Sequence, residues 1–532
     1  MSSGGDDPRA AEGAGGSRLL GLLLAMAMFV LVVDTSLMNV SISAVVRDLG
    51  TTVSGVQSAI ALEALVSAAF ILIGGKVGDL IGRKRAYVLG LLGYAVGATA
   101  MAFAQGLTAV IVFWAVIGGI GASLLLPAMQ SLIHGNFDGA ARKQVYALVG
   151  AAAAIAAAVG PLLGGFITTY LSWRVGFVLE VVVIAVVLGG AKLVRDVPYA
   201  GPRGVDVVGA GLSVVGMGGL VLGILVWQEG GERVGLVLAI GVLGLVGLVF
   251  WLRHRARRAE PALLDPALFS SAHFRVGVSQ QLLQQVALGG TMIVLPIFLQ
   301  MVLEYDAMEA GLTIAPLSLS MFGLAILAGK RSGKRRPATV VGVGFGLVVI
   351  GILVLLPLVP RADTGWVLVG PLVIAGAGLG LLVSQLNNYT LSPVPEERVS
   401  EAAGVNSAAG SFGLSFGLAF AGAIMLAALA YTFTAETEAS TVLPPAEKQQ
   451  VAQVLEEDAE LMSNTRLAEL LATQPEAIRQ EIIRINTEAR PFALQIGLLV
   501  PLLAAALGVT NSLRMRRLPD PEPSGAAETT LG

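Results

Sequence analysis

Long apolar stretches, separated by short polar or basic segments, recur along almost the whole chain. Each stretch is close to the ~20 residues that a helix needs to cross a bilayer. We expect fourteen spanning helices near 19–46, 53–75, 86–105, 108–133, 145–170, 174–195, 206–228, 234–252, 276–303, 308–329, 338–359, 366–391, 402–432 and 491–513. The pattern predicts an all-α polytopic membrane protein.

Composition supports this fold class. Of the 532 residues, 55% are hydrophobic and 13% are charged, about half the ~25% charge of a soluble domain. The absence of cysteine excludes a disulfide framework, a thiolate metal site and a cysteine nucleophile. The net charge of −2 and the scattered basic residues argue against a nucleic-acid partner.

The basic residues predict the orientation. Most Lys and Arg fall in segments that lie inside the cell if both termini are cytoplasmic, as the positive-inside rule requires. The main clusters are Lys76 to Arg85, Arg253 to Arg258, Lys330 to Arg336 and Arg514 to Arg517. Residues 1–18 are expected to be a disordered cytoplasmic tail, and 514–532 a second one. The predicted location is a bacterial inner membrane.

Residues 434–490 are the one sizeable non-membrane segment, and they fall outside in this topology. Helical spacing is visible in Val451, Val454, Leu455 and Leu461. A second helix is expected to start at Thr473 to Glu476, with Thr473 as N-cap and Pro475 early in the helix. We expect a small extracytoplasmic helical hairpin, which either serves as an exit vestibule or partner dock or simply caps the outer surface.

The sequence contains no pattern that is typical of an enzyme active site. Gly323 to Lys330 has the wrong spacing for a P-loop, and Arg331 stands where Ser or Thr should hold magnesium. The three histidines lack metal-ligand spacing, and there is no nucleophile and base pattern. We therefore expect no enzyme activity, no cofactor and no metal, and we favour gradient-driven movement of a solute.

Three acidic residues fall inside predicted spans: Asp34, Glu63 and Glu180. A carboxylate at a helix centre costs about 2.5–3.5 kcal/mol, so each needs a partner, a cavity or a proton. Asp34 shares a helical face with Met38 and Ser41, and Glu63 shares one with Ser67, as a water-lined cavity wall would require. These acids are candidates for proton coupling and cation binding. The alternative is a structural role, and Glu180 could instead pair with an interfacial group.

Uncharged polar residues could line a substrate route or bond neighbouring helices. The ninth span carries Gln280, Gln281, Gln284, Gln285 and Gln300, and Gln281 and Gln285 lie one turn apart. The candidate cavity-lining residues are Asn39, Ser67, Gln281, Gln285, Asn387, Asn388 and Asn406.

The turn after the second span carries the sequence GKVGDLIGRKR, residues 75–85. Gly75 would permit close helix approach and Gly82 a tight turn, while Asp79 beside Arg83 and Lys84 could form an ion-paired gate. This segment resembles the signature cytoplasmic loop of the major facilitator superfamily.

Three further segments resemble the fourteen-helix drug:proton antiporters of that superfamily. Residues 34–40 look like its D-T-x-x-x-N-V element. Gly160, Pro161, Gly164 and Gly165 look like its antiporter motif, where proline and small residues give a bend at the interface between halves. Residues 296–300 with 310–312 and Pro316 look like its helix 9–10 region.

The resemblance implies a major facilitator fold with two six-helix bundles, at 19–196 and 275–513, and two inserted helices at 206–252. Such halves rock about a midplane site. The sequence departs from the family pattern at Ala115, where an arginine linked to proton coupling is expected, and at Glu63 and Glu180, where many relatives have tyrosine and asparagine. These changes make the N-terminal half more negative and favour a cationic or zwitterionic substrate.

We therefore expect an exporter of amphipathic, cationic compounds that exchanges them for protons, with the lipid bilayer as its surroundings. One alternative is an exporter of lipid or an endogenous metabolite that works with an envelope partner through the 434–490 loop. Another is a non-transporting receptor or scaffold on the same fold.

Overall fold

The computed structural model describes residues 8–137, 139–196, 206–228, 233–258, 260, 262–330, 335–394, 399–444, 448, 451 and 464–520. These residues form helices, turns and connecting loops, with no β-strand among them. Fourteen helices within the described ranges are long and apolar enough to cross a membrane. The predicted all-α fold and the number of spans are confirmed.

The helices of the N-terminal part pack mainly on one another, and we call this group the N-terminal bundle. Its elements are α1 (Pro8–Leu49), α2 (Val53–Ile81), α3 (Arg83–Ala102), α4 (Leu107–Ala109), η1 (Val110–Gly118), α5 (Gly119–Asn136), α6 (Gly139–Tyr170), α7 (Trp173–Gly189) and η2 (Gly190–Leu193). Helix α1 packs on α6 and α7, and α3 packs on η1, α5 and α7. The bundle interior therefore lies between α1, α3 and α7.

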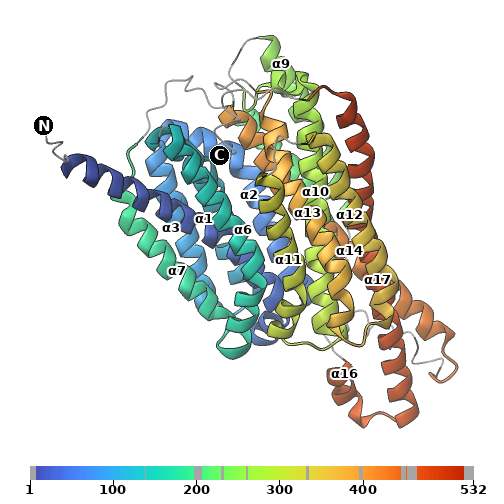
Figure 1. The fold of residues 1–532 in the computed structure, drawn as a ribbon. Coiled ribbons are helices and arrows are strands. Elements are labelled where there is room, and N and C mark those ends of the chain that lie inside the picture. Colours follow the sequence, from blue (N-terminus) through green and yellow to red (C-terminus); the bar gives the residue numbers. More distant parts are fainter. Residues whose placement is uncertain are drawn as a thin grey trace, which may run out of the picture.

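The C-terminal bundle is built in the same way around α10, α14 and α17 (Figure 1). Its elements are η3 (Pro266–Ser270), α10 (Ala272–Ile297), η4 (Phe298–Val302), α11 (Ala307–Lys330), α12 (Pro337–Leu358), η5 (Val359–Arg361), η6 (Gly365–Leu368), α13 (Val369–Leu391), α14 (Val399–Ala439), α16 (Asn464–Leu470), η8 (Leu471–Thr473) and α17 (Glu476–Arg517). The elements η1 and η4 are π-helical, and the other η elements are short 3₁₀ turns.

Two helices, α8 (Val207–Gln228) and α9 (Val234–Arg257), connect the bundles. They pack closely on each other, and α8 also lies against α2 and α14. Asp206 fixes this pair: its carboxylate accepts hydrogen bonds from the Trp251 indole (2.8 Å) and from the backbone N–H of Leu263 (3.0 Å). The inserted pair thus covers one flank of the contact between the bundles.

The two ends of the molecule differ in charge. One end carries α16 and the start of α17, and we call it the loop end (Figure 1). The opposite end carries the first residues of α3 and the last turns of α9 and α17, which are rich in arginine, and we call it the basic end. This segregation follows the pattern that the sequence predicts.

The helices around the acidic 434–490 segment are longer than expected. Helix α14 continues to Ala439, and α17 runs without a break from Glu476 to Arg517. The predicted N-cap at Thr473 is wrong: residues 471–473 form a 3₁₀ turn, and Pro475 is the N-cap, without a side-chain capping bond. Most of the helix predicted around Val454 lies outside the described residues.

The bundles touch at a tight contact between α6 and α11 toward the loop end, which we call the seam. A Cβ atom added at Gly165 would lie 2.5 Å from the Ala307 carbonyl oxygen, and one at Gly311 would lie 2.3 Å from the Pro161 carbonyl oxygen. Gln300 of η4 also bridges to α1, donating to the Val40 carbonyl and accepting from the Ser43 N–H, both at 3.2 Å. The two bundles are therefore joined here by close approach of their backbones and by hydrogen bonds of the Gln300 side-chain amide.

Candidate functional site: an enclosed acid cluster

Asp34 lies at the centre of the N-terminal bundle and is fully enclosed, with 0% of its surface exposed. Its Oδ2 atom accepts hydrogen bonds from the Tyr94 hydroxyl of α3 and from the Trp114 indole of η1, the latter at 2.8 Å. Its Oδ1 atom is buried without a hydrogen-bond partner. Neutral donors hold one oxygen in place, and the second oxygen remains available for a proton.

The position of Trp114 depends on an unusual backbone. Residues Val110–Gly118 form a π-helix, a conformation that is rare and often found at functional sites. The wider turn holds the Trp114 ring toward α1, where its edge packs 6.4 Å from Phe177 of α7, measured between ring centroids. Ala115, the position where the family arginine is expected, lies in the same π-helix and is buried. A neutral indole next to that position therefore contacts the acid.

Glu63 of α2 and Glu180 of α7 complete the cluster. They are 8% and 3% exposed, and both interact electrostatically with Asp34. Tyr94 interacts with all three carboxyl groups, and both Glu180 oxygens are buried without a hydrogen-bond partner. Asp34 and each of the two glutamates repel one another when both groups are ionised. The cluster can therefore hold and release protons, and its members cannot be treated as independent groups.

The structure differs from the predicted water-lined wall at this point. Met38 and Ser41, which share a face with Asp34, are both 0% exposed. The Ser41 hydroxyl donates to the Leu37 carbonyl at 2.7 Å and bonds Thr168 of α6 at 2.6 Å. Ser67, on the face of Glu63, is also buried. These faces are buried because α1 packs on α6 and α7, and α2 packs on α5.

The predicted gate motif lies at the basic end. Arg83 donates to the Asp79 carboxylate at 3.3 Å. Gly82 adopts φ +101°, which is left-handed and typical of glycine, so the tight turn predicted there is confirmed. The Lys84 backbone N–H donates to Asp196 at 3.0 Å, so this residue joins the turn to the segment after η2 through its main chain.

The prediction for Gly75 is wrong. A Cβ atom there would make an ordinary 3.7 Å contact with Pro127, whereas one at Gly74 would lie 2.3 Å from the Ser123 carbonyl oxygen. Helices α2 and α5 therefore approach at Gly74, one residue earlier. Gly74 faces α5 directly, and the resemblance of residues 75–85 to the family loop could not predict this contact.

The residues of the antiporter motif make close contacts with two different helices. Added Cβ atoms at Gly160 and Gly164 would lie 2.5 Å and 2.8 Å from the Ser36 and Val40 side chains of α1. Gly165 and the Pro161 carbonyl face α11 instead, at the seam. The motif thus brings α6 close to α1 within its own bundle and to α11 across the bundles.

The predicted cavity-lining residues occupy different environments. Asn39 donates to the Thr35 carbonyl of its own helix at 2.8 Å. Gln281 and Gln285 face α14 near Gly410. Asn406 donates to exposed Asn387 at 3.0 Å, which joins α14 to α13, and Asn388 accepts from Ser392. The structure does not bring these residues together around one cavity.

Sequence reasoning missed two side chains that contact Asp34 and one buried arginine. Tyr94 and Trp114 contact Asp34 from 60 and 80 residues away, and no local pattern links them. Arg490 is 5% exposed at the loop end. It directly precedes the last predicted span, so the cost of a charge inside a span gave no signal for it.

The sequence matches the model of a known family. Residues 24–205 and 200–418 match the model described as Major Facilitator Superfamily. The Puromycin resistance protein pur8 of Streptomyces alboniger is 30% identical over 76% of this chain and 80% of its own length. The Multidrug export protein EmrB of Escherichia coli K12 is 27% identical over 75% and 78%.

Structural similarity extends over nearly the whole chain. The structure of a bacterial homologue of the human lysosomal transporter Spinster has a TM-score of 0.62 at 13% identity. It covers 94% of this chain and 98% of that one.

Proposed function

This chain belongs to the Major Facilitator Superfamily, in its multidrug efflux branch, and we propose that it exports amphipathic compounds across a bacterial inner membrane in exchange for protons. It is a multi-pass membrane transporter with curated relatives named for drug resistance and export. The proposed coupling rests on one observation: Asp34, Glu63 and Glu180 share an enclosed site inside the N-terminal bundle.

In this proposal Asp34 carries the transported proton. Its ionised form is held by Tyr94 and Trp114, and protonation removes the repulsion from Glu63 and Glu180. When one more positive charge enters with the proton than leaves with the compound, a potential of 100 mV supplies about 2.3 kcal/mol, enough for more than tenfold accumulation of substrate outside. Because α1 carries both Asp34 and the Val40 carbonyl that bonds Gln300, a shift of α1 on protonation can reach the contact between the bundles.

The proposed cycle is alternating access. The basic end is cytoplasmic by the positive-inside rule, so both termini lie inside and the loop end lies outside. The tight seam and the Gln300 bridge close the contact between the bundles toward the outside. We infer that the structure represents a state closed to the outside, and that opening there requires both contacts to separate.

A second function, export of lipid or a metabolite with an envelope partner, has one observation in its favour. Thr465, just inside α16, donates from its N–H (3.0 Å) and hydroxyl (2.6 Å) to Glu304 after η4. The loop therefore contacts the chain just after η4, the π-helix that carries Gln300. A partner that binds the loop could act on the outer contact.

The experiment is puromycin accumulation in cells that lack their own efflux pumps, with and without this chain. The proposal predicts lower accumulation, which a protonophore reverses at constant ATP. The variant Asp34→Asn should lose export, whereas Asp363→Asn, at an exposed loop-end acid, should not. Export that survives the protonophore would contradict proton exchange, and full export by Asp34→Asn would contradict the role of that residue.

A further inference from the structure

An exposed carboxylate anchors the start of α7 at the outer surface of the N-terminal bundle. Asp48, at the end of α1, accepts hydrogen bonds from the Trp173 indole at 2.9 Å and from the Arg174 guanidinium. Arg174 also donates to the Ala104 carbonyl at 2.6 Å and lies over the Trp173 ring, 4.5 Å from its centroid. Asp48 is exposed, whereas Trp173 is 3% exposed. A surface carboxylate therefore fixes the orientation of a buried ring.

Two edge-to-face contacts lead from this ring to the acid cluster. Phe177, one turn further along α7, lies 6.0 Å from Trp173 and 6.4 Å from Trp114, measured between ring centroids. We call these three side chains the ring chain. The Trp114 indole donates to Asp34 at 2.8 Å. Phe177 and Trp114 are 0% and 2% exposed, and close-packed interiors transmit displacements from one side chain to the next. The orientation of Trp114 therefore depends on that of Trp173.

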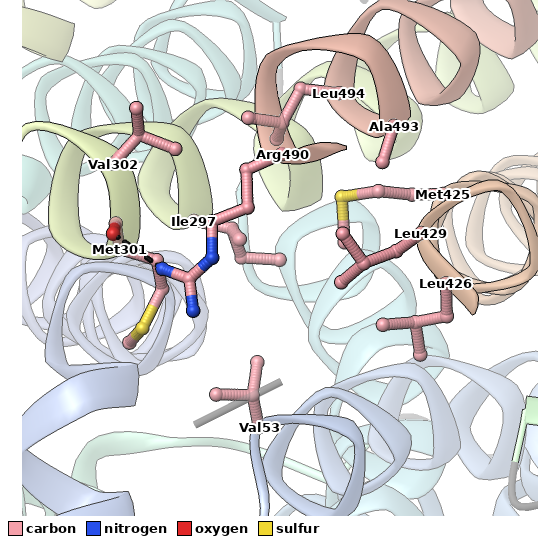
Figure 2. Close-up of a pocket in the computed structure, with 10 residues that line it drawn as sticks. All are labelled: Val53, Ile297, Met301, Val302, Met425, Leu426, Leu429, Arg490, Ala493 and Leu494. Carbon is pink, nitrogen blue, oxygen red and sulfur yellow. Dashed lines mark hydrogen bonds between the residues drawn. The ribbon is translucent and has the colours of Figure 1, made fainter. Parts of the chain in front are cut away.

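The outer end of the C-terminal bundle is anchored differently. Arg490 of α17 donates to the Met301 carbonyl at 2.7 Å, and Figure 2 shows its guanidinium beside Met301, on the side toward Val53. The ten residues that line the pocket at this place include no aromatic side chain. A contact made by Arg490 here is therefore not passed on by rings, as it is from Asp48.

We propose that Asp48 is a positioning residue for proton binding at Asp34. It fixes Trp173, and the ring chain then holds the Trp114 indole on the acid. This inference rests on the proposed role of Asp34 in proton exchange and adds a group at the outer surface to it. Without the bond to Asp48, Trp173 and Phe177 can turn. Weaker donation from Trp114 then destabilises the ionised form of Asp34, so that Asp34 keeps its proton to a higher pH.

The test titrates Asp34 itself by infrared difference spectroscopy of the full-length protein in lipid vesicles. The part of the protonated carboxyl band that Asp34→Asn removes reports this residue. Asp48→Ala should raise the pH midpoint of that band by about 0.4–1 unit, the range that one edge-to-face contact can transmit. Asp48→Asn should stay close to the wild type, because its amide oxygen can accept from Trp173. Asp363→Ala, at an exposed loop-end acid of the other bundle, should not change the midpoint. An unchanged midpoint in Asp48→Ala would overturn the proposal.

Two further variants separate the ring chain from a shift of the whole helix α7. Trp173→Phe keeps a ring but loses the bond to Asp48, so it should give the midpoint of Asp48→Ala, and the double variant should shift no further. Phe177→Leu keeps the bond between Asp48 and Trp173 but removes both edge-to-face contacts, and it should raise the midpoint as well. A wild-type midpoint in Phe177→Leu would overturn the ring chain.

The titratable groups that face Asp34 are unchanged in these variants. In the described part of the chain they are Tyr94 of α3, Glu63 of α2 and Glu180 of α7. Because the midpoint belongs to the whole cluster, the difference between variants is the quantity to compare. The titration needs neither puromycin nor a gradient. Shifted midpoints in a protein that does not exchange puromycin for protons would support the ring chain and refute the exchange, whereas unshifted midpoints with intact exchange would refute the ring chain alone.

Discussion

Substituting Gly311 by alanine should weaken the closed seam by a predictable amount. The added Cβ atom would lie 2.3 Å from the Pro161 carbonyl oxygen, below the 3.0 Å that Cβ contacts tolerate, so α6 and α11 must separate by about 0.7 Å. Both neighbours are helical backbone and cannot rotate away. Overpacking of this kind costs about 1–3 kcal/mol, which changes a two-state equilibrium about 5–150-fold. Gly165→Ala should act in the same direction.

The assay is a pulsed electron paramagnetic resonance distance between spin labels at Gln105→Cys and Asp363→Cys. Both sites are exposed at the loop end, one in each bundle, and the chain has no native cysteine. Gly311→Ala should increase the population with the longer distance. The controls are Gly323→Ala on α11 and Gly150→Ala on α6, where an added Cβ meets nothing within 4 Å. A distance distribution in Gly311→Ala like that of the controls would refute the reasoning.

Two further substitutions and one loop replacement test the Gln300 bridge, the Trp114 hydrogen bond and the role of the outer loop. Gln300→Ala removes two hydrogen bonds between the bundles, worth about 0.5–1.5 kcal/mol each, and should lengthen the same spin-label distance; an unchanged distance would contradict its bridging role. Trp114→Phe removes a hydrogen-bond donor to Asp34 and should slow proton-driven puromycin transport in proteoliposomes about tenfold or more. The control variant Trp366→Phe, at an exposed tryptophan, should transport at the wild-type rate. Equal rates in the two variants would contradict a role of the Trp114 hydrogen bond. Replacing residues 441–474 by a short Gly/Ser linker leaves α17 intact and should preserve puromycin efflux from cells, and loss of efflux from a folded variant would favour the partner-dependent function.

The sequence was sufficient for the fold and for part of the site. Apolar runs predict the spans because every backbone polar group in a bilayer must be bonded within a helix. Asp34 was identifiable because a carboxylate inside a span is costly. Its partners were not, since Tyr94 and Trp114 reach it through tertiary packing and a π-helix. The enclosure of Asp34 also depends on how α6 and α7 pack on α1, which the pattern of one helix does not contain.

At the loop end, too, contacts between distant residues could not be predicted from the sequence. The start of α17 was predicted from Pro475, but its continuation through Pro491 to Arg517 was not, because proline before a span is typical of a boundary. That continuity brings Arg490 to Met301 of a helix almost two hundred residues earlier. Residue pairs of this kind are defined by packing between helices and carry no local pattern.

The most direct test of the account measures proton movement together with substrate movement in proteoliposomes. An imposed pH gradient should drive puromycin uptake by the wild type, with a matched release of protons from the lumen. Asp34→Asn should lose this gradient-driven uptake while still exchanging labelled for unlabelled puromycin, because exchange needs no net proton transfer. If Asp34→Asn keeps gradient-driven uptake at the wild-type rate, the enclosed acid cluster is not the coupling site.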